Sequence, residues 1–122
     1  MSIYNIGTDI EEIDRFVRML AFRPHILKKI FKEEEWNYAF SKPRSAKSLA
    51  GIWCAKEAVA KAFTPLVAIK IQDITIVHAS LGYPKVNFTH PELQNEEVNV
   101  SVSISHSVKY ATASAIVSYR NI

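Results

Sequence analysis

Five polar residues stand in or beside segments that are otherwise apolar, and their types suit phosphate chemistry: Asp9, Arg44, Glu57, Lys61 and His106. Two carboxylates from separate segments suit Mg²⁺, which keeps several waters and usually takes one or two protein carboxylates plus substrate phosphates. A lysine beside such a cation can neutralise a phosphate oxygen, and the cation can stabilise charge that develops on a pyrophosphate leaving group. The residue types therefore predict magnesium-assisted phosphoryl chemistry, provided that the fold brings them together.

Each of these residues also has a purely structural explanation. Asp9 could be a turn residue at a strand end, and His106 could be a hairpin-turn residue bonded to backbone. Glu57 and Lys61 could be an ordinary helix pair that contributes about 0.2–0.5 kcal/mol. The glutamates at 33–35 point around a helix rather than to one spot, so we expect them to favour the positive end of its dipole rather than to bind a metal.

The segment 49–63 must position Glu57 and Lys61. Alanine is the best helix former, and the large apolar residues here recur three, four or seven positions apart, so an α-helix is predicted after a possible cap at Ser45. Because this helix is apolar around most of its circumference, we expect it to be covered on most sides. Glu57 and Lys61 share a face suited to something lying on it, together with three small residues, Ala50, Cys54 and Ala58.

Residues 3–10 are predicted to form a strand, because apolar residues alternate with polar or small ones. Asp9 then lies on the less apolar face, where Gly7 leaves room for close approach of backbone or ligand. Helices dominate the first half and antiparallel strands the second, which predicts an α+β fold with helices packed on an antiparallel sheet and a single domain over residues 1–122. The other predicted elements are helices at 15–22, capped by Asp14, at 24–31 and at 33–40, strands at 74–78, 85–88, 98–105 and 110–119, and an irregular crossing or short helix at 89–93.

The composition restricts the possible partners and compartments. The formal net charge of the 122 residues is +3 and the pI is about 9.0. This mild excess favours acidic partners and is too small, without a binding motif, to indicate nucleic acid. The single cysteine cannot form an internal disulfide, no apolar run approaches membrane-spanning length, and the first residues lack the basic start of a secretion signal. We therefore expect a cytoplasmic protein with no membrane partner.

Three sequence blocks resemble the signature blocks of the holo-[acyl-carrier-protein] synthases, the small bacterial class of 4′-phosphopantetheinyl transferases. They are residues 6–15 (IGTDIEEIDR), 53–63 (WCAKEAVAKAF) and 102–106 (VSISH), in the family's order. The turn Gly82-Tyr83-Pro84 also resembles the Gly-x-Pro turn that the family carries between its second and third blocks. The resemblance spans nearly the whole chain, and it implies the 4′-phosphopantetheinyl transferase fold.

The resemblance implies transfer of the phosphopantetheine arm of coenzyme A to a serine of apo-acyl carrier protein, with release of adenosine 3′,5′-bisphosphate, in support of fatty acid biosynthesis. By position, Asp9 and Glu57 would hold Mg²⁺ against the coenzyme A pyrophosphate. Lys61 would contact a phosphate and help to stabilise the transition state, and His106 would contact the coenzyme near its phosphates; these four are the expected catalytic residues. Arg44 resembles the basic loop residue that meets the 3′-phosphate of the adenosine.

The resemblance also implies the partners. Gly82 and Pro84 would contact the coenzyme, and basic residues of the first helices would face the acidic recognition helix of the carrier protein. Family members are homotrimers with active sites between subunits, which suits a small apolar chain with long helix faces to cover. The competing hypothesis is a non-catalytic adaptor of the same fold that binds an acidic carrier protein or a nucleotide. The basic residues of the first helices that are expected to face the carrier protein are Arg15, Arg18, Arg23, Lys28 and Lys29.

Some features stay open or depart from the family pattern. The group that removes the serine proton is either an unliganded oxygen of Asp9 or Glu57 or a water on the cation. Ile52 occupies a position that is often basic in relatives, and Thr64 stands where a glycine commonly follows the helix, so one coenzyme contact and the next loop should differ. Cys54 replaces a commoner alanine and is expected to be a packing residue.

Overall fold

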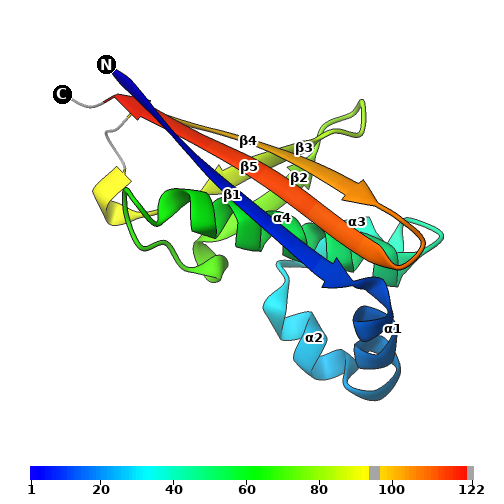
Figure 1. Ribbon diagram of the computed structural model, residues 1–122. Coiled ribbons are helices and arrows are strands. Elements are labelled where there is room, and N and C mark those ends of the chain that lie inside the picture. The colour runs from blue at the N-terminus through cyan, green and yellow to red at the C-terminus, as the bar shows by residue number, and fades with distance from the viewer. Residues whose placement is uncertain (94–96, 121–122) are drawn as a thin grey trace.

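The computed structural model describes residues 1–93 and 97–120, and its main sheet has three antiparallel strands (Figure 1). Their order is β1 (Ser2–Glu12), β5 (Tyr110–Arg120) and β4 (Val98–His106), so the first and last strands of the chain lie side by side. The long helix α4 (Ser45–Phe63) packs across one face of this sheet. The strand that carries Asp9 is thereby packed against the helix that carries Glu57 and Lys61.

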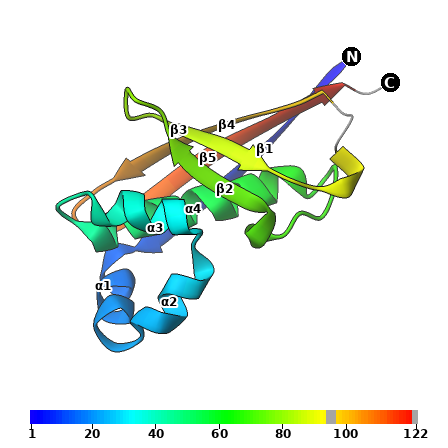
Figure 2. The same cartoon turned by 180° about the vertical axis from the view of Figure 1, so that it is seen from behind.

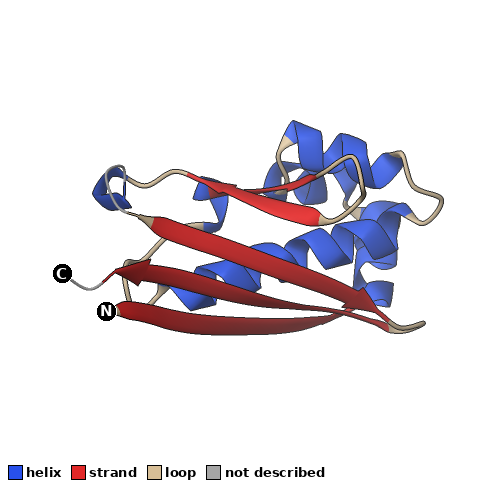
Figure 3. Cartoon of the chain, turned by 90° about the horizontal axis from the view of Figure 1, so that it is seen from above, coloured by secondary structure: helices blue, strands red, loops and turns tan. Residues whose placement is uncertain are grey.

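The shorter elements lie on the same side of the sheet as α4 (Figure 3). Helix α1 follows β1 directly, and α1 and α3 both pack against α4 (Figure 2). A separate two-stranded hairpin, β2 and β3, contacts α3 through β2 and the main sheet through β3. No helix within residues 1–93 and 97–120 is long and apolar enough to cross a membrane. The bounds are α1 (Ile13–Phe22), α2 (Pro24–Ile30), α3 (Glu33–Phe40), β2 (Ile74–His78), β3 (Pro84–Phe88) and the short 3₁₀ turns η1 (Ile71–Asp73) and η2 (Pro91–Leu93).

Strand β1 and helix α4 touch through their backbones at Gly7. A Cβ atom at this position would collide with the carbonyl oxygen of Ala58 and would lie 2.8 Å from the backbone nitrogen of Ala62. Only glycine permits this approach, and the small residues on the facing side of α4 permit it from the other side. The small-residue face predicted from the sequence is therefore covered by β1, which brings Asp9 to the helix.

The inward face of β1 is the less apolar one. Gly7 and Asp9 point toward α4, whereas Tyr4, Ile6 and Ile10 point away from it and are exposed. Ile6 pairs in register with Ile116 of β5, which is also exposed, so these residues form an apolar stripe on the outer face of the sheet. The alternation in the sequence indicated a strand correctly, but its apolar side is not the side that meets the core helix.

A buried ion pair between Lys56 of α4 and Glu35 of α3 joins these two helices to β2. The Lys56 ammonium lies 2.8 Å from Glu35 Oε1, and both side chains are fully buried. Glu35 also accepts the backbone N–H of Lys32 through Oε1 and that of Ile76 through Oε2, each at 2.8 Å. Of the three adjacent glutamates, Glu35 alone is buried, so they point in different directions as the helical geometry required. The pair fixes α3 and β2 against α4.

Three local predictions need correction. Asp14 does not cap α1, because the helix begins at Ile13 and Asp14 lies in its first turn. Ser45 is the first residue of α4 rather than its cap, since the helix begins four residues before the predicted segment. His106 is the last residue of β4, where it pairs with Ala111, so the strand extends one residue beyond the predicted end at Ser105 and the alternative explanation of His106 as a turn residue is wrong.

Candidate active site

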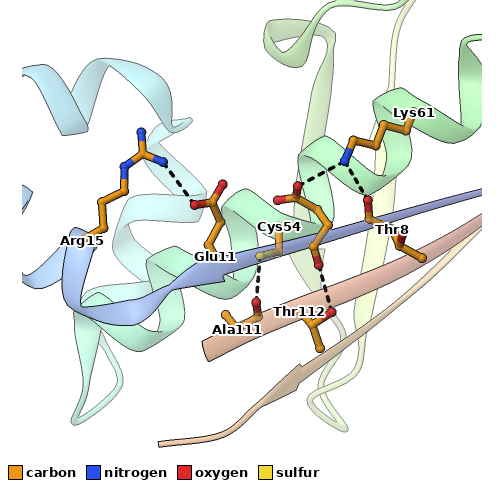
Figure 4. Close-up of polar contacts among 8 residues, drawn as sticks. Thr8, Glu11, Arg15, Cys54, Lys61, Ala111 and Thr112 are labelled. Carbon is orange, nitrogen blue, oxygen red and sulfur yellow. Dashed lines mark hydrogen bonds and ion pairs between the residues drawn. The ribbon is translucent and has the colours of Figure 1, made fainter. Parts of the chain in front are cut away.

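Lys61 of α4 reaches β1 at Thr8 (Figure 4), and it also contacts Asp9, the next residue of that strand. Lys61 Nζ lies 3.3 Å from Asp9 Oδ1 and donates to the carbonyl oxygen of Thr8 at 2.9 Å. The Asp9 side chain is only 14% exposed, whereas the lysine is about half exposed. The second carboxylate oxygen of Asp9, Oδ2, is buried and has no hydrogen-bond partner among the described residues. A buried carboxylate oxygen without a donor is costly, and a cation would compensate it.

Glu57 lies close enough to Asp9 for their charges to interact. Burial raises the pKa of Glu57 above its usual range, the negative charge of Asp9 raises it further, and Lys61 acts in the opposite direction. Two carboxylates that repel one another beside one lysine form a site that is short of positive charge. No group of three or more acidic, histidine or cysteine side chains that could hold a metal ion occurs in the described part of the chain. Two carboxylates, one of which has an oxygen without a hydrogen-bond partner among the described residues, fit Mg²⁺, which takes its remaining ligands from water and phosphate.

Cys54 lies one turn before Glu57 on the same helix. Its thiol donates to the carbonyl oxygen of Ala111 at 3.3 Å and is buried. Burial, reinforced by the negative charge of Asp9, raises the pKa of this thiol to about 12. A thiol with that pKa stays protonated and unreactive, so Cys54 fills space between α4 and the sheet.

His106 and Arg44 both line a pocket near the beginning of α4. The Nε2–H of His106 donates to the carbonyl oxygen of Lys47 at 3.1 Å, and the ring lies against Gly51, where a Cβ atom would come within 2.6 Å of it. Burial lowers the pKa of His106, although the carbonyl opposes the shift. The ring borders a pocket of about 390 Å³ that also contains three cationic side chains, and such a pocket suits an anionic ligand. Its lining residues are Tyr38, Lys42, Pro43, Arg44, Lys47, Ser48 and His106.

Five of the predicted site residues thus form two groups, which lie beside different parts of α4. Asp9, Glu57 and Lys61 make up the carboxylate centre, and Arg44 and His106 belong to the basic pocket. Ser48 in the pocket and Glu57 differ by nine positions on α4, which corresponds to about 14 Å at 1.5 Å per residue. A ligand with two separated phosphate groups could occupy both.

The turn between β2 and β3 contains the other two predicted coenzyme residues. Gly82 has a φ of 95°, a backbone conformation that favours glycine, and Pro84 is the first residue of β3. Neither residue lines the basic pocket. Their contact with the coenzyme stays a prediction.

The predicted partner-binding residues lie on α1 and on the segment that follows it. Arg15, Arg18 and Arg23 line a shallow surface pocket of about 470 Å³ together with Met19, Phe22 and Ile26. Lys28 and Lys29 are exposed in the last turn of α2. Phe22 is 79% exposed between the arginines, so this surface offers apolar area as well as charge. We call the surface formed by these eight residues the basic helical surface.

Sequence reasoning missed Glu11. It lies two positions after Asp9 on the same inward face of β1, and its side chain is 17% exposed. Its carboxylate accepts a hydrogen bond from Arg15 at 3.1 Å, and its charge contributes to the raised pKa of both Glu57 and Cys54. The signal that could have revealed it is its spacing of two from Asp9.

Comparison with known proteins identifies the class to which this fold and site belong. A family model described as ACPS, 4′-phosphopantetheinyl transferase superfamily, matches residues 5–115. The chain belongs to the 4′-phosphopantetheinyl transferase superfamily, and the prediction that it is an enzyme of this class is confirmed.

Individual relatives agree with this assignment. The chain is 39% identical over 118 residues to a holo-[acyl-carrier-protein] synthase of Caldicellulosiruptor bescii, with 93% of this chain and 97% of the relative covered. It is also 39% identical over 122 residues to the enzyme of that name from Chlamydia caviae, covering 95% and 98%. The solved structure of the Bacillus anthracis holo-(acyl-carrier-protein) synthase, in complex with CoA (3′,5′-ADP), superimposes with a TM-score of 0.77 at 29% identity, covering 98% and 100%. The predicted α+β transferase fold is confirmed.

Proposed function

We propose that this protein transfers the 4′-phosphopantetheine arm of coenzyme A to a serine hydroxyl of apo-acyl carrier protein and releases adenosine 3′,5′-bisphosphate. The observation that carries the proposal is the carboxylate centre of Asp9, Glu57 and Lys61, with the basic pocket on the same helix. The names of the relatives and the coenzyme A ligand of the Bacillus anthracis structure support both substrates.

The basic pocket would bind the adenosine end of the coenzyme. Arg44 can present a planar pair of donors to the 3′-phosphate, and Lys47 adds a second positive charge at the same wall. His106 already uses Nε2–H on a backbone carbonyl, so its Nδ1 is free to accept a hydrogen bond from a ribose hydroxyl. The pocket would thereby fix one end of a long substrate while the pyrophosphate reaches the carboxylate centre.

The carboxylate centre would act on the pyrophosphate. Asp9 and Glu57 would hold Mg²⁺, which when bound would supply positive charge beside the pyrophosphate oxygens. Lys61 is half exposed, and within residues 1–93 and 97–120 its ammonium contacts only Asp9 Oδ1 and the carbonyl oxygen of Thr8, so it can turn to a phosphate oxygen. There it would offset the charge that develops on the leaving phosphate in the transition state. Simultaneous binding of both substrates would align the serine oxygen with the β-phosphorus.

The basic helical surface would receive the carrier protein. An acidic helix of the partner can pair with the arginines of α1, while Phe22 and Ile26 provide apolar contact between the charges. The two lysines of α2 would extend the positive field along the same side. Electrostatic attraction of this kind speeds association and weakens with salt.

We also propose that the chain acts as a single domain and assembles as a homotrimer with active sites between subunits. The outer face of the main sheet supports this assembly, because Tyr4, Ile6, Ile10 and Ile116 form an exposed apolar stripe on two paired strands. Contiguous exposed apolar residues on a sheet face commonly mark a protein interface. Sedimentation analysis tests the assembly, since substitution of Ile6 and Ile116 by lysine should yield monomers.

The direct test of the reaction is the intact mass of the carrier protein. Incubation with coenzyme A and Mg²⁺ should increase the mass of apo-acyl carrier protein by one phosphopantetheine group. Glu57→Gln should keep the fold and lose the modification, and Glu34→Gln, an exposed glutamate on α3, is the matched control. An unchanged carrier mass, with a carrier that a second transferase does modify, would contradict the proposal. A non-catalytic adaptor would bind the carrier in a salt-sensitive manner and would not need Glu57.

A further inference from the structure

The ion pair between Glu11 and Arg15 connects the carboxylate centre to the basic helical surface (Figure 4). Glu11 lies on the inward face of β1, whereas Arg15 lies on α1 with its side chain 56% exposed. Their atoms Oε2 and Nη1 are 3.1 Å apart. One partner therefore faces the proposed reaction centre, and the other faces the solvent from which an acidic carrier would arrive.

Glu11 is electrostatically part of the carboxylate centre. Asp9 and Glu11 share one face of β1, and both side chains are largely buried. The negative charges of both residues act on the Cys54 thiol of α4, and Glu57 follows Cys54 by one turn of that helix. The charge of Glu11 accordingly reaches Glu57. In the free protein, the guanidinium of Arg15 neutralises part of this negative charge.

Arg18 offers a comparison on the same helix. It forms an ion pair of similar length, 3.0 Å, with Asp14. Asp14 belongs to α1 itself and its side chain is 75% exposed, so water screens its charge. A carrier that displaces Asp14 from Arg18 releases a solvated carboxylate, whereas a carrier that displaces Glu11 from Arg15 releases a buried one.

We propose that Arg15 is shared between Glu11 and the carrier protein, so that carrier docking frees the Glu11 charge and strengthens the attraction of the carboxylate centre for its divalent cation. This inference rests on the proposed function, because it takes the carrier as the acidic partner. Glu11 acts here through its charge and is a positioning residue rather than a catalytic one. Since binding couplings are reciprocal, the bound cation also favours carrier docking.

Binding of Mn²⁺ to the whole protein, measured without coenzyme A by the paramagnetic resonance of free Mn²⁺, tests the proposal. Saturating apo-acyl carrier protein should tighten Mn²⁺ binding about five-fold, at the lower end of typical couplings. Without carrier, Arg15→Gln should tighten Mn²⁺ binding to a similar extent, because it removes the charge that neutralises Glu11. The matched control Arg18→Gln should change it much less.

Glu11→Gln should weaken Mn²⁺ binding and abolish the effect of the carrier. Equal Mn²⁺ affinities for wild type and Arg15→Gln, or equal changes for Arg15→Gln and Arg18→Gln, would overturn the proposal, and neither comparison needs a carrier. A wild-type protein that modifies the carrier but binds Mn²⁺ equally with and without it would overturn the coupling and leave the proposed function intact. Thermal melts of each variant establish that the fold is retained.

Discussion

Replacement of Lys56 by methionine tests the role of the buried ion pair behind α4. The Lys56 ammonium lies 2.8 Å from Glu35 Oε1, and neither side chain is exposed. Burial lowers the pKa of Lys56, although its partner Glu35 opposes the shift. Methionine keeps most of the lysine stem and removes the charge, so Lys56→Met leaves Glu35 as a buried carboxylate with two backbone N–H donors and no counter-charge.

Loss of one partner of a buried ion pair costs about 3–5 kcal/mol. The two remaining N–H donors satisfy part of the Glu35 carboxylate, so we expect a loss at the lower end, about 3 kcal/mol. A domain of this size unfolds with a free energy of about 5–15 kcal/mol, so the variant should still fold but with a much smaller free energy of unfolding. Glu35→Gln should also destabilise the fold. The amide nitrogen of the glutamine would face the backbone N–H of either Ile76 or Lys32, and two hydrogen-bond donors cannot pair.

Urea unfolding followed by tryptophan fluorescence measures these effects, since Trp36 and Trp53 both pack against Phe31 near the pair. The slope of unfolding free energy against urea should stay constant while the midpoint falls. The double variant Lys56→Met with Glu35→Gln should lose clearly less than the sum of the single variants, because no unpaired charge remains. A loss below about 1 kcal/mol for Lys56→Met, or strictly additive losses, would show that the ion pair does not stabilise the fold in this way.

Two further predictions follow from the packing and from the histidines. Gly7→Ala should destabilise the fold by about 3 kcal/mol or more and abolish carrier modification, because the added methyl collides with the backbone of Ala58, which cannot move aside. Urea unfolding measures the stability and the mass assay measures the modification. Wild-type stability of this variant would contradict the close approach of β1 and α4. The folded protein should lose stability as the pH falls below about 6.5, since burial lowers the pKa values of His78 and His106 and the unfolded chain binds protons first. The urea midpoint should therefore fall as the pH is lowered through this range. His78→Gln should make this dependence on pH weaker, whereas replacement of the exposed His25 should not. An unchanged pH dependence in His78→Gln would show that protonation of His78 does not destabilise the fold.

Local sequence patterns predicted the elements well because local physics determines them. The apolar spacing around Glu57 and Lys61 indicated α4 and put both residues on one side of it. The spacing of two along β1 indicated a strand and placed Asp9 and Gly7 on one face. This spacing could not show which face of β1 meets the core, because that depends on α4. The backbone of α4 approaches β1 so closely that only a glycine fits at position 7.

The features that were missed arise from contacts between distant segments. The sequence pattern placed Glu35 only among three acids at the positive end of a helix dipole, and its burial follows from Lys56 and from the Ile76 N–H, both far along the chain. Glu11 gains its importance from α4, because its charge acts on Glu57 and Cys54 there, more than forty positions along the chain. The predicted contacts of Gly82 and Pro84 with the coenzyme stay predictions, because only a structure with the coenzyme bound would show them.

The central claim is that Asp9 and Glu57 share one divalent cation beside Lys61. Crystals grown with coenzyme A and Mn²⁺, with diffraction data collected at the manganese absorption edge, test it most directly. We expect one anomalous peak between the two carboxylates, in contact with the coenzyme pyrophosphate. A manganese peak bound elsewhere, or bound to one of these carboxylates with the other turned away, would contradict the account.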